Sequence, residues 1–201
     1  MTKPNRLALF AACIALWTAN ALAGLDHKVT YDDSGIWSRS DQNVLRYGAL
    51  ITTIGIALWE GGDTRLGLSA WQSIDSVTMA AIIAETTKRA TGRLRPAETD
   101  DPHQWRMGGR SFPSGEVAEI SSVVTPYVLE YGAAHPWIYG LEILPVYDAI
   151  ARVKVQAHWQ SDVIAGFVVG TVSGYVAHER ESPLILSVMP HGIVVGLRTR
   201  F

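Results

Sequence analysis

Apolar residues are concentrated in several long segments of the chain, and each segment is bounded by residues that favour the start or the end of a helix. Residues 44–59 are mostly apolar and are followed closely by two glycines, which predicts a buried helix that ends there. Asp63 or Thr64 can cap the next helix, which continues to a basic last turn with Gly92 just beyond it. The pattern therefore opens with two helices joined by a short turn.

Three more helices are predicted in the second half of the chain. Ser111 or Ser114 would start the first of them, and Pro126 is expected to kink or interrupt it. Residues 136–154 and 159–178 carry helical patterns of their own. The expected fold class is therefore all-α, a helical bundle of about five helices.

The end of the chain has a different pattern. Residues 184–189 and 193–201 are enriched in β-branched side chains, and a Pro-His-Gly turn separates them. This order predicts a small C-terminal β-hairpin that closes over the helical bundle. His191, inside the turn, is interpreted as a structural residue.

The beginning of the chain has the three parts of a secretory signal peptide. Lys3 and Arg6 are positive, residues 7–17 are apolar, and residues 21–23 form a small-residue cleavage sequence. We therefore expect a signal peptide over residues 1–23 and a single exported, periplasmic domain over residues 24–201. An uncleaved membrane anchor is the alternative interpretation of the same segment.

Composition limits the possible functions. A chain of 201 residues with 48% hydrophobic and 18% charged residues can build one compact core. Its net charge of −2, without a dense basic stripe, argues against nucleic-acid binding. The single cysteine, Cys13, lies in the expected signal peptide, so no disulfide is predicted. The apolar segments 44–59 and 163–177 are shorter than the roughly 20 residues that span a bilayer, which favours a soluble or peripheral domain over an integral one.

The segment 152–162 contains a candidate nucleophile. His158 and Asp162 are four residues apart, so a helix entered near this point places both on one face. A carboxylate that accepts from one ring nitrogen fixes the tautomer and leaves the other nitrogen free to attack. Arg152, just upstream, could hold an anion in front of that nitrogen. Taken alone, the same spacing also fits an ordinary surface pair.

Two further segments could hold the same anion. Lys88 lies at the end of a predicted helix, and Arg95 follows it in the loop 93–113, so a point charge and a forked guanidinium could converge. The backbone amides of Pro-Ser-Gly at 113–115, together with the Ser114 hydroxyl, could form an anion site at a helix N-terminus. A solvated basic face and a simple turn are the plainer interpretations of each segment.

In this order the three segments resemble the signature motifs of the phosphatidic acid phosphatase type 2 superfamily, which also includes bacterial class A acid phosphatases and vanadium haloperoxidases. The resemblance covers residues 88–162. It implies a phosphoric monoester hydrolase, an acid or lipid phosphatase, that works through a phosphohistidine and uses neither a metal nor another cofactor. It assigns nucleophilic attack to His158, orientation of the ring to Asp162, and phosphate binding to Lys88, Arg95, Ser114, Gly115 and Arg152.

The chain departs from the family pattern at two positions. Glu116 stands where the second motif ordinarily has the histidine that protonates the leaving oxygen, and Ala151 stands where the third motif has serine. Nearby cations should keep a glutamate ionised. The hypothesis is therefore a phosphatase that works best at acid pH, or on leaving groups such as phosphate that need little protonation. His103, in the preceding loop, is the other candidate acid.

The substrate class stays open at this stage. A phosphorylated small molecule, a lipid phosphate and a pyrophosphate all fit the motifs, and peripheral or integral membrane association fits the last two. A catalytically degenerate protein that binds phosphate or a phospholipid headgroup in the cell envelope is the main alternative. A vanadate-dependent haloperoxidase and a structural envelope protein are the others.

Overall fold

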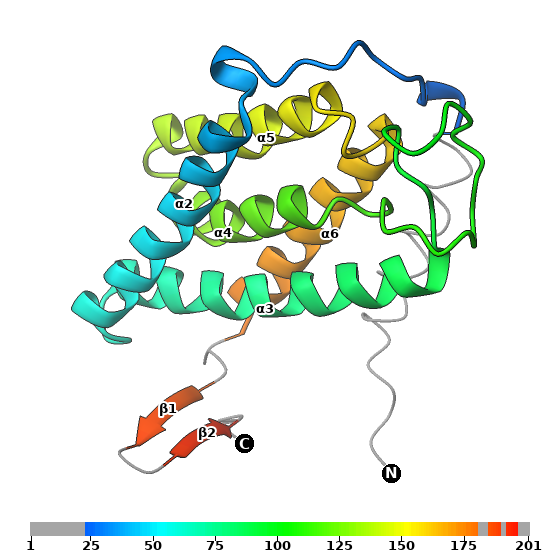
Figure 1. Cartoon of the computed structure of the whole chain (residues 1–201). Coiled ribbons are helices and arrows are strands. Elements are labelled where there is room, and N and C mark those ends of the chain that lie inside the picture. Colours follow the sequence, from blue (N-terminus) through cyan, green and yellow to red (C-terminus); the bar gives the residue numbers. More distant parts are fainter. Residues whose placement is uncertain (1–22, 181–184, 190–191, 197–201) are drawn as a thin grey trace.

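The computed structural model describes residues 23–180, 185–189 and 192–196, the last two groups as backbone only. Five α-helices make up most of the described part (Figure 1). They are α2 (Arg39–Glu60), α3 (Arg65–Thr91), α4 (Gly115–Tyr131), α5 (Ile143–Lys154) and α6 (Gln160–His178). Short 3-10 helices cover Ala23–Leu25, Gly35–Trp37 and Pro136–Glu142. The predicted helical bundle and its five helices are confirmed.

The capping residues explain where the first two helices begin and end. The Ser38 hydroxyl accepts a hydrogen bond from the Asp41 amide, so α2 starts five residues earlier than the apolar pattern alone predicted. Thr64 caps α3 in the same way by accepting from the Gly67 amide at 3.0 Å. Gly92, with φ of 56°, ends α3 in the left-handed conformation that glycine adopts readily.

Two details of the predicted helices need correction. The single helix expected over residues 136–154 is a 3-10 helix followed by α5. Pro126 lies inside α4 and does not interrupt it. The reason is that α4 packs extensively against both α3 and α6, and tertiary contacts of this kind stabilise a helix that contains a proline.

Glycines on α6 allow it to approach α4 closely. A Cβ atom on Gly166 would lie 2.4 Å from the Ser114 carbonyl oxygen, and one on Gly170 would lie 2.3 Å from that of Ala118. At the same end of the interface, the Ser114 amide donates to the Asp162 carbonyl at 2.8 Å. This contact joins the start of α4 to the start of α6, and both ends carry predicted site residues.

The strands β1 (Ile185–Met189) and β2 (Gly192–Gly196) pair antiparallel, with Ile185 opposite Gly196. Figure 1 shows both strands beyond the end of α6 and apart from the helices, so the predicted closure of a hairpin over the bundle is not found. The predicted turn at 190–191 lies outside the described residues. So does most of the predicted signal peptide.

Candidate active site

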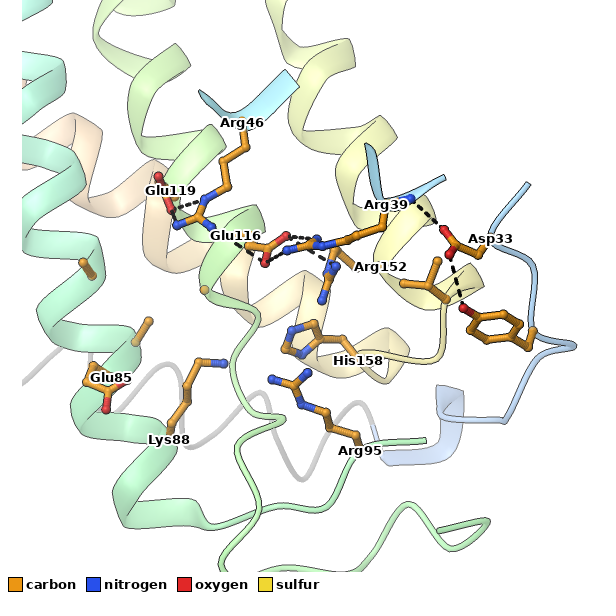
Figure 2. A pocket seen from close by; sticks show the side chains of 15 residues that line it. Asp33, Arg39, Arg46, Glu85, Lys88, Arg95, Glu116, Glu119, Arg152 and His158 are labelled. Atoms are coloured by element: carbon orange, nitrogen blue, oxygen red, sulfur yellow. Dashed lines mark hydrogen bonds and ion pairs between the residues drawn. The ribbon is translucent and has the colours of Figure 1, made fainter. Parts of the chain in front are cut away.

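A cavity of about 610 Å³ opens where the start of α2 and the end of α3 meet the start of α4, the end of α5 and the loop before α6. Six of the eight predicted site residues line it: Lys88, Arg95, Gly115, Glu116, Arg152 and His158. Figure 2 shows the side chains of Lys88, Arg95 and Arg152 pointing toward the His158 ring from different sides. Residues from all three sequence segments therefore meet in one pocket.

His158 lies at the base of this cavity and is only 3% exposed. Its Nδ1 atom donates a hydrogen bond to the Ser111 carbonyl at 2.7 Å and lies 3.7 Å from a carboxylate oxygen of Asp162. This hydrogen bond fixes the tautomer and leaves Nε2 without a proton. Burial lowers the pKa of His158 to about 4 despite the nearby Asp162 charge, so the ring is neutral at neutral pH.

Asp162 supports the histidine indirectly. Its Oδ2 atom accepts hydrogen bonds from the Trp159 amide at 2.9 Å and from the Ser111 hydroxyl, and the carbonyl of the same serine holds the imidazole. Its Oδ1 atom accepts from Arg93 at 2.6 Å. Although burial opposes ionisation, these partners and His158 hold the pKa of Asp162 below its usual value. The residue is thus a fixed anion beneath the ring.

Lys88 lines the cavity together with His158, the predicted nucleophile, and Ser114 directly precedes Gly115 in the cavity lining. The Lys88 ammonium donates to the carbonyls of Pro113 at 2.6 Å and Arg110 at 3.0 Å, which leaves one of its three N–H groups for a ligand. Burial, and then the charge of Arg95, lower the pKa of Lys88 to about 8. Ser114 is fully buried behind the cavity wall, and its hydroxyl has no hydrogen-bond partner among the described residues.

Arg152 and Arg95 differ in how firmly they are held. Arg152 is 5% exposed, and its Nη1 atom donates to Gln42 at 2.9 Å and lies 3.4 Å from Glu116. The Arg95 guanidinium reaches the cavity from the loop after α3, where it is half-buried. One cation is therefore fixed in place, and the other sits on a loop.

Glu116 is a fixed anion rather than a proton donor. Its two carboxylate oxygens accept from Arg39 at 2.6 and 2.7 Å, while Arg152 lies 3.4 Å away and Arg46 3.9 Å away. Burial alone would raise the pKa of Glu116, but these arginines lower it to about 2. The acid role considered for Glu116 has no support in this geometry. His103, the other candidate, is exposed and does not line the cavity.

Sequence reasoning missed several charged residues that build this site. Arg39 and Arg46 lie seven positions apart near the start of α2 and reach the cavity from one face of the helix. Arg46 also pairs with Glu119 at 2.7 Å. The helical spacing was a signal for a shared face, but their partners lie more than 70 residues away in the chain. No group of acidic, histidine or cysteine side chains in the described part of the chain is arranged to hold a metal ion.

A second, apolar cavity of about 530 Å³ adjoins the same helices. It lies between α2, α4 and the segment leading into α5, about one helical turn from the Arg46–Glu119 pair. Its lining is almost entirely hydrocarbon and includes Leu45, Ala49, Ile56, Val123, Val124 and Leu144. None of the helices in the described part of the chain has both the length and the apolarity that a membrane crossing requires.

The sequence of the protein carries the signature of a known family. The family model described as the PAP2 superfamily matches residues 69–182, which span the end of the bundle where Lys88, Ser114 and His158 meet. The chain therefore belongs to the PAP2 superfamily, as the three segments predicted.

Individual relatives match about half of the length of this chain. A lipid A 1-phosphatase of Porphyromonas gingivalis is 32% identical over 108 residues, which are 52% of this chain and 22% of the relative. An undecaprenyl-diphosphatase of Sulfolobus acidocaldarius is 29% identical over 110 residues, 53% of this chain and 52% of the relative. The matches thus span less than two thirds of either relative.

One solved structure is similar over most of its length. It is the crystal structure of the first transmembrane PAP2 type phosphatidylglycerolphosphate phosphatase from Bacillus subtilis. The similarity covers 85% of this chain and 93% of that chain, with 16% identity and a TM-score of 0.48.

Proposed function

We propose that the protein is a phosphatase that transfers a phosphoryl group to His158 and then to water. The observation that carries this proposal is the neutral His158 ring, which faces a cavity lined by Lys88, Arg95 and Arg152. Phosphoryl transfer needs an in-line nucleophile and positioned cations around the transferred group. Three positive side chains that line one cavity can supply that neutralisation, so the proposed reaction is independent of a metal.

The proposed reaction has two displacements. His158 Nε2 forms a bond to phosphorus while the bond from phosphorus to the leaving oxygen breaks. Water then attacks the phosphohistidine, the P–N bond breaks and its electron pair returns to Nε2, and the water gives up its proton to solvent. The Ser111 carbonyl and the Asp162 carboxylate stabilise the positive ring between the two steps.

The leaving group receives its proton from solvent in this scheme, because Glu116 carries none above pH of about 2. Substrates whose leaving group is a good anion, such as a diphosphate, are then hydrolysed faster than simple alkyl phosphates. This preference separates the proposed enzyme from family members with a histidine at the position of Glu116.

We assign the substrate to the lipid phosphates or diphosphates. The apolar cavity beside the site can accept a hydrocarbon chain whose phosphate lies at His158. The relatives named above carry lipid A and undecaprenyl substrates in their names. An exported protein, with residues 1–23 as its signal peptide, would meet such lipids at the surface of the envelope membrane.

A phosphate-release assay tests the proposal. Purified protein is given a polyprenyl diphosphate, a lipid monophosphate and a soluble aryl phosphate, alongside the His158→Ala variant and His103→Ala as the matched control. We expect release to be lost in His158→Ala, retained in His103→Ala, and fastest with the diphosphate. Equal release by His158→Ala contradicts the proposal. Phosphate binding without turnover in the wild type supports the degenerate binding protein instead.

A further inference from the structure

A buried carboxyl group lies behind the site and has no role in the reaction described above. Asp148 is on α5, one turn before Arg152, and is 0% exposed. Neither of its carboxyl oxygens has a hydrogen-bond partner among the described residues. An ionised carboxylate in such a place is costly, because no donor among the described residues replaces its hydration. The burial and the missing donors together favour the protonated form.

The groups that act on Asp148 come from three helices. The charges of Arg39 and Arg46 on α2, of Glu116 on α4 and of Arg152 on its own helix act on it through space, and Tyr147 is the adjacent titratable group. Within the same network Arg46 also pairs with Glu119. These three arginines and two glutamates leave one net positive charge as long as Asp148 keeps its proton. Ionisation of Asp148 would cancel that charge directly behind Arg152.

We propose that Asp148 is a proton-holding positioning residue and that an anion entering the cavity is bound together with a proton on this side chain. Asp148 does not line the cavity, so it acts on the ligand only through Arg152 and Glu116. A bound anion favours the uncharged carboxyl group, and by linkage the uncharged carboxyl group favours the anion. The inference uses the proposed function only in taking the cavity as an anion site.

The direction of the pH dependence follows from the same groups. Burial, and then the charge of Glu116, raise the pKa of Asp148 to about 7. Anion affinity should therefore be full below this pH and fall as Asp148 loses its proton above it. Lys88, with a pKa of about 8, lines the cavity and loses its charge at higher pH. Two successive losses of affinity are expected, and only the first belongs to Asp148.

Sulfate is the probe for this proposal, because its charge is constant across the pH range in question. Its dissociation constant is measured calorimetrically on the full chain from about pH 5.5 to 9 for the wild type, Asp148→Asn and the exposed control Asp63→Asn. We expect the wild type and the control to lose affinity roughly tenfold between about pH 6 and 8. Asp148→Asn should keep its low-pH affinity until Lys88 titrates.

Two results overturn the inference. One is a sulfate affinity that depends on pH in the same way in Asp148→Asn and in the wild type. The other is a sulfate affinity that is lower by the same factor at every pH in Asp148→Asn, which would mark Asp148 as a purely structural residue. Absence of sulfate binding at any pH overturns the anion site and the inference together. If sulfate binds with the expected pH dependence but phosphate release is absent, the inference stands and the proposed phosphatase activity falls.

A second measurement uses the wild type alone and does not depend on the folding of a variant. The infrared carbonyl band of a protonated carboxylic acid should grow when sulfate is added at about pH 7, because binding draws a proton onto Asp148. Histidine and lysine do not contribute to this band. A spectrum without growth of the band at saturating sulfate contradicts the proposal.

Discussion

At the scale of single residues, His158 should set the acid limit of the proposed reaction. The ring must be unprotonated to attack, and its pKa is lowered to about 4. Turnover should therefore hold as the pH falls from neutral and decline only near pH of about 4. A pH profile of kcat on a polyprenyl diphosphate checks this limit. A decline centred at a pH of about 6.5, the ordinary pKa of histidine, would show that burial does not lower the pKa of His158.

Glu116 should control the preference among leaving groups. Replacing it by histidine would supply a proton donor at the position where the resemblance leads us to expect one. We expect Glu116→His to raise the ratio of aryl or alkyl phosphate hydrolysis to diphosphate hydrolysis by about a hundredfold, the lower end of the usual range for general acid catalysis. Glu119→Gln, which removes a neighbouring carboxylate that pairs with Arg46, is the control. A ratio that moves equally in both variants would point to a change in charge alone.

The residues of this site were only partly predictable from the sequence. Lys88, Gly115 and His158 could be grouped because they fall in three spaced motifs. The contact of the Ser111 carbonyl with His158 could not be predicted, because a backbone oxygen has no signature in the sequence. Arg39 could not either, since its bidentate contact with Glu116 joins residues 77 positions apart.

At the scale of elements, Arg93 ties three segments together. It donates to Asp162 at the start of α6 and to Asp26 in the N-terminal segment, and all three side chains are essentially buried. Arg93→Met would leave two buried carboxylates without their cation, so we expect a loss of about 3–5 kcal/mol in the free energy of unfolding. Denaturant unfolding measures it. Arg89→Ala, which breaks an exposed pair with Glu85, should change stability little.

The close approach of α6 to α4 is a second feature at the scale of elements. Gly170→Ala would force a Cβ atom against the Ala118 carbonyl, and we expect it to cost about 1–3 kcal/mol and to reduce turnover by shifting the helix that follows His158. Gly55→Ala is the control on α2, because a Cβ atom there meets nothing within 4 Å. That variant should be neutral or slightly stabilising. Equal stability of the two variants would contradict the described interface.

The hydrophobic pattern predicted the helices well and their packing poorly. Capping residues such as Thr64 and Gly92 act on their own neighbours, so their signals are local and readable. The close approach of α6 to α4 depends on small residues whose partners are distant in the sequence, and the apolar pattern does not specify them. The same packing explains why α4 tolerates Pro126.

At the scale of the whole molecule, the polar site and the apolar cavity share the seam between α2 and α4. Five cations from four parts of the chain gather at one end of the seam, and hydrocarbon side chains line the other. The Arg46–Glu119 pair lies between them. A substrate with a charged head and a long apolar tail matches both parts at once, whereas a soluble ester uses only the first.

The separation of the polar site from the apolar cavity predicts that a substitution in the apolar cavity lowers the hydrolysis of lipid substrates alone. Leu45→Asn places an amide in the apolar cavity, which should lower kcat/KM for a polyprenyl diphosphate by about tenfold, since burying an unpaired amide costs about 1–3 kcal/mol. Hydrolysis of a soluble aryl phosphate should stay within about twofold of the wild type, because the charged site is unchanged.

The control for Leu45→Asn is Ile51→Asn on the same helix. Ile51 is 70% exposed and does not line the apolar cavity. If this cavity holds the hydrocarbon tail of the lipid, only Leu45→Asn lowers the hydrolysis of the polyprenyl diphosphate while leaving that of the soluble aryl phosphate unchanged. If both variants reduce lipid hydrolysis equally, the exposed surface of α2 rather than the cavity governs access to the lipid. If neither does, the tail lies elsewhere and the polar site alone selects the substrate.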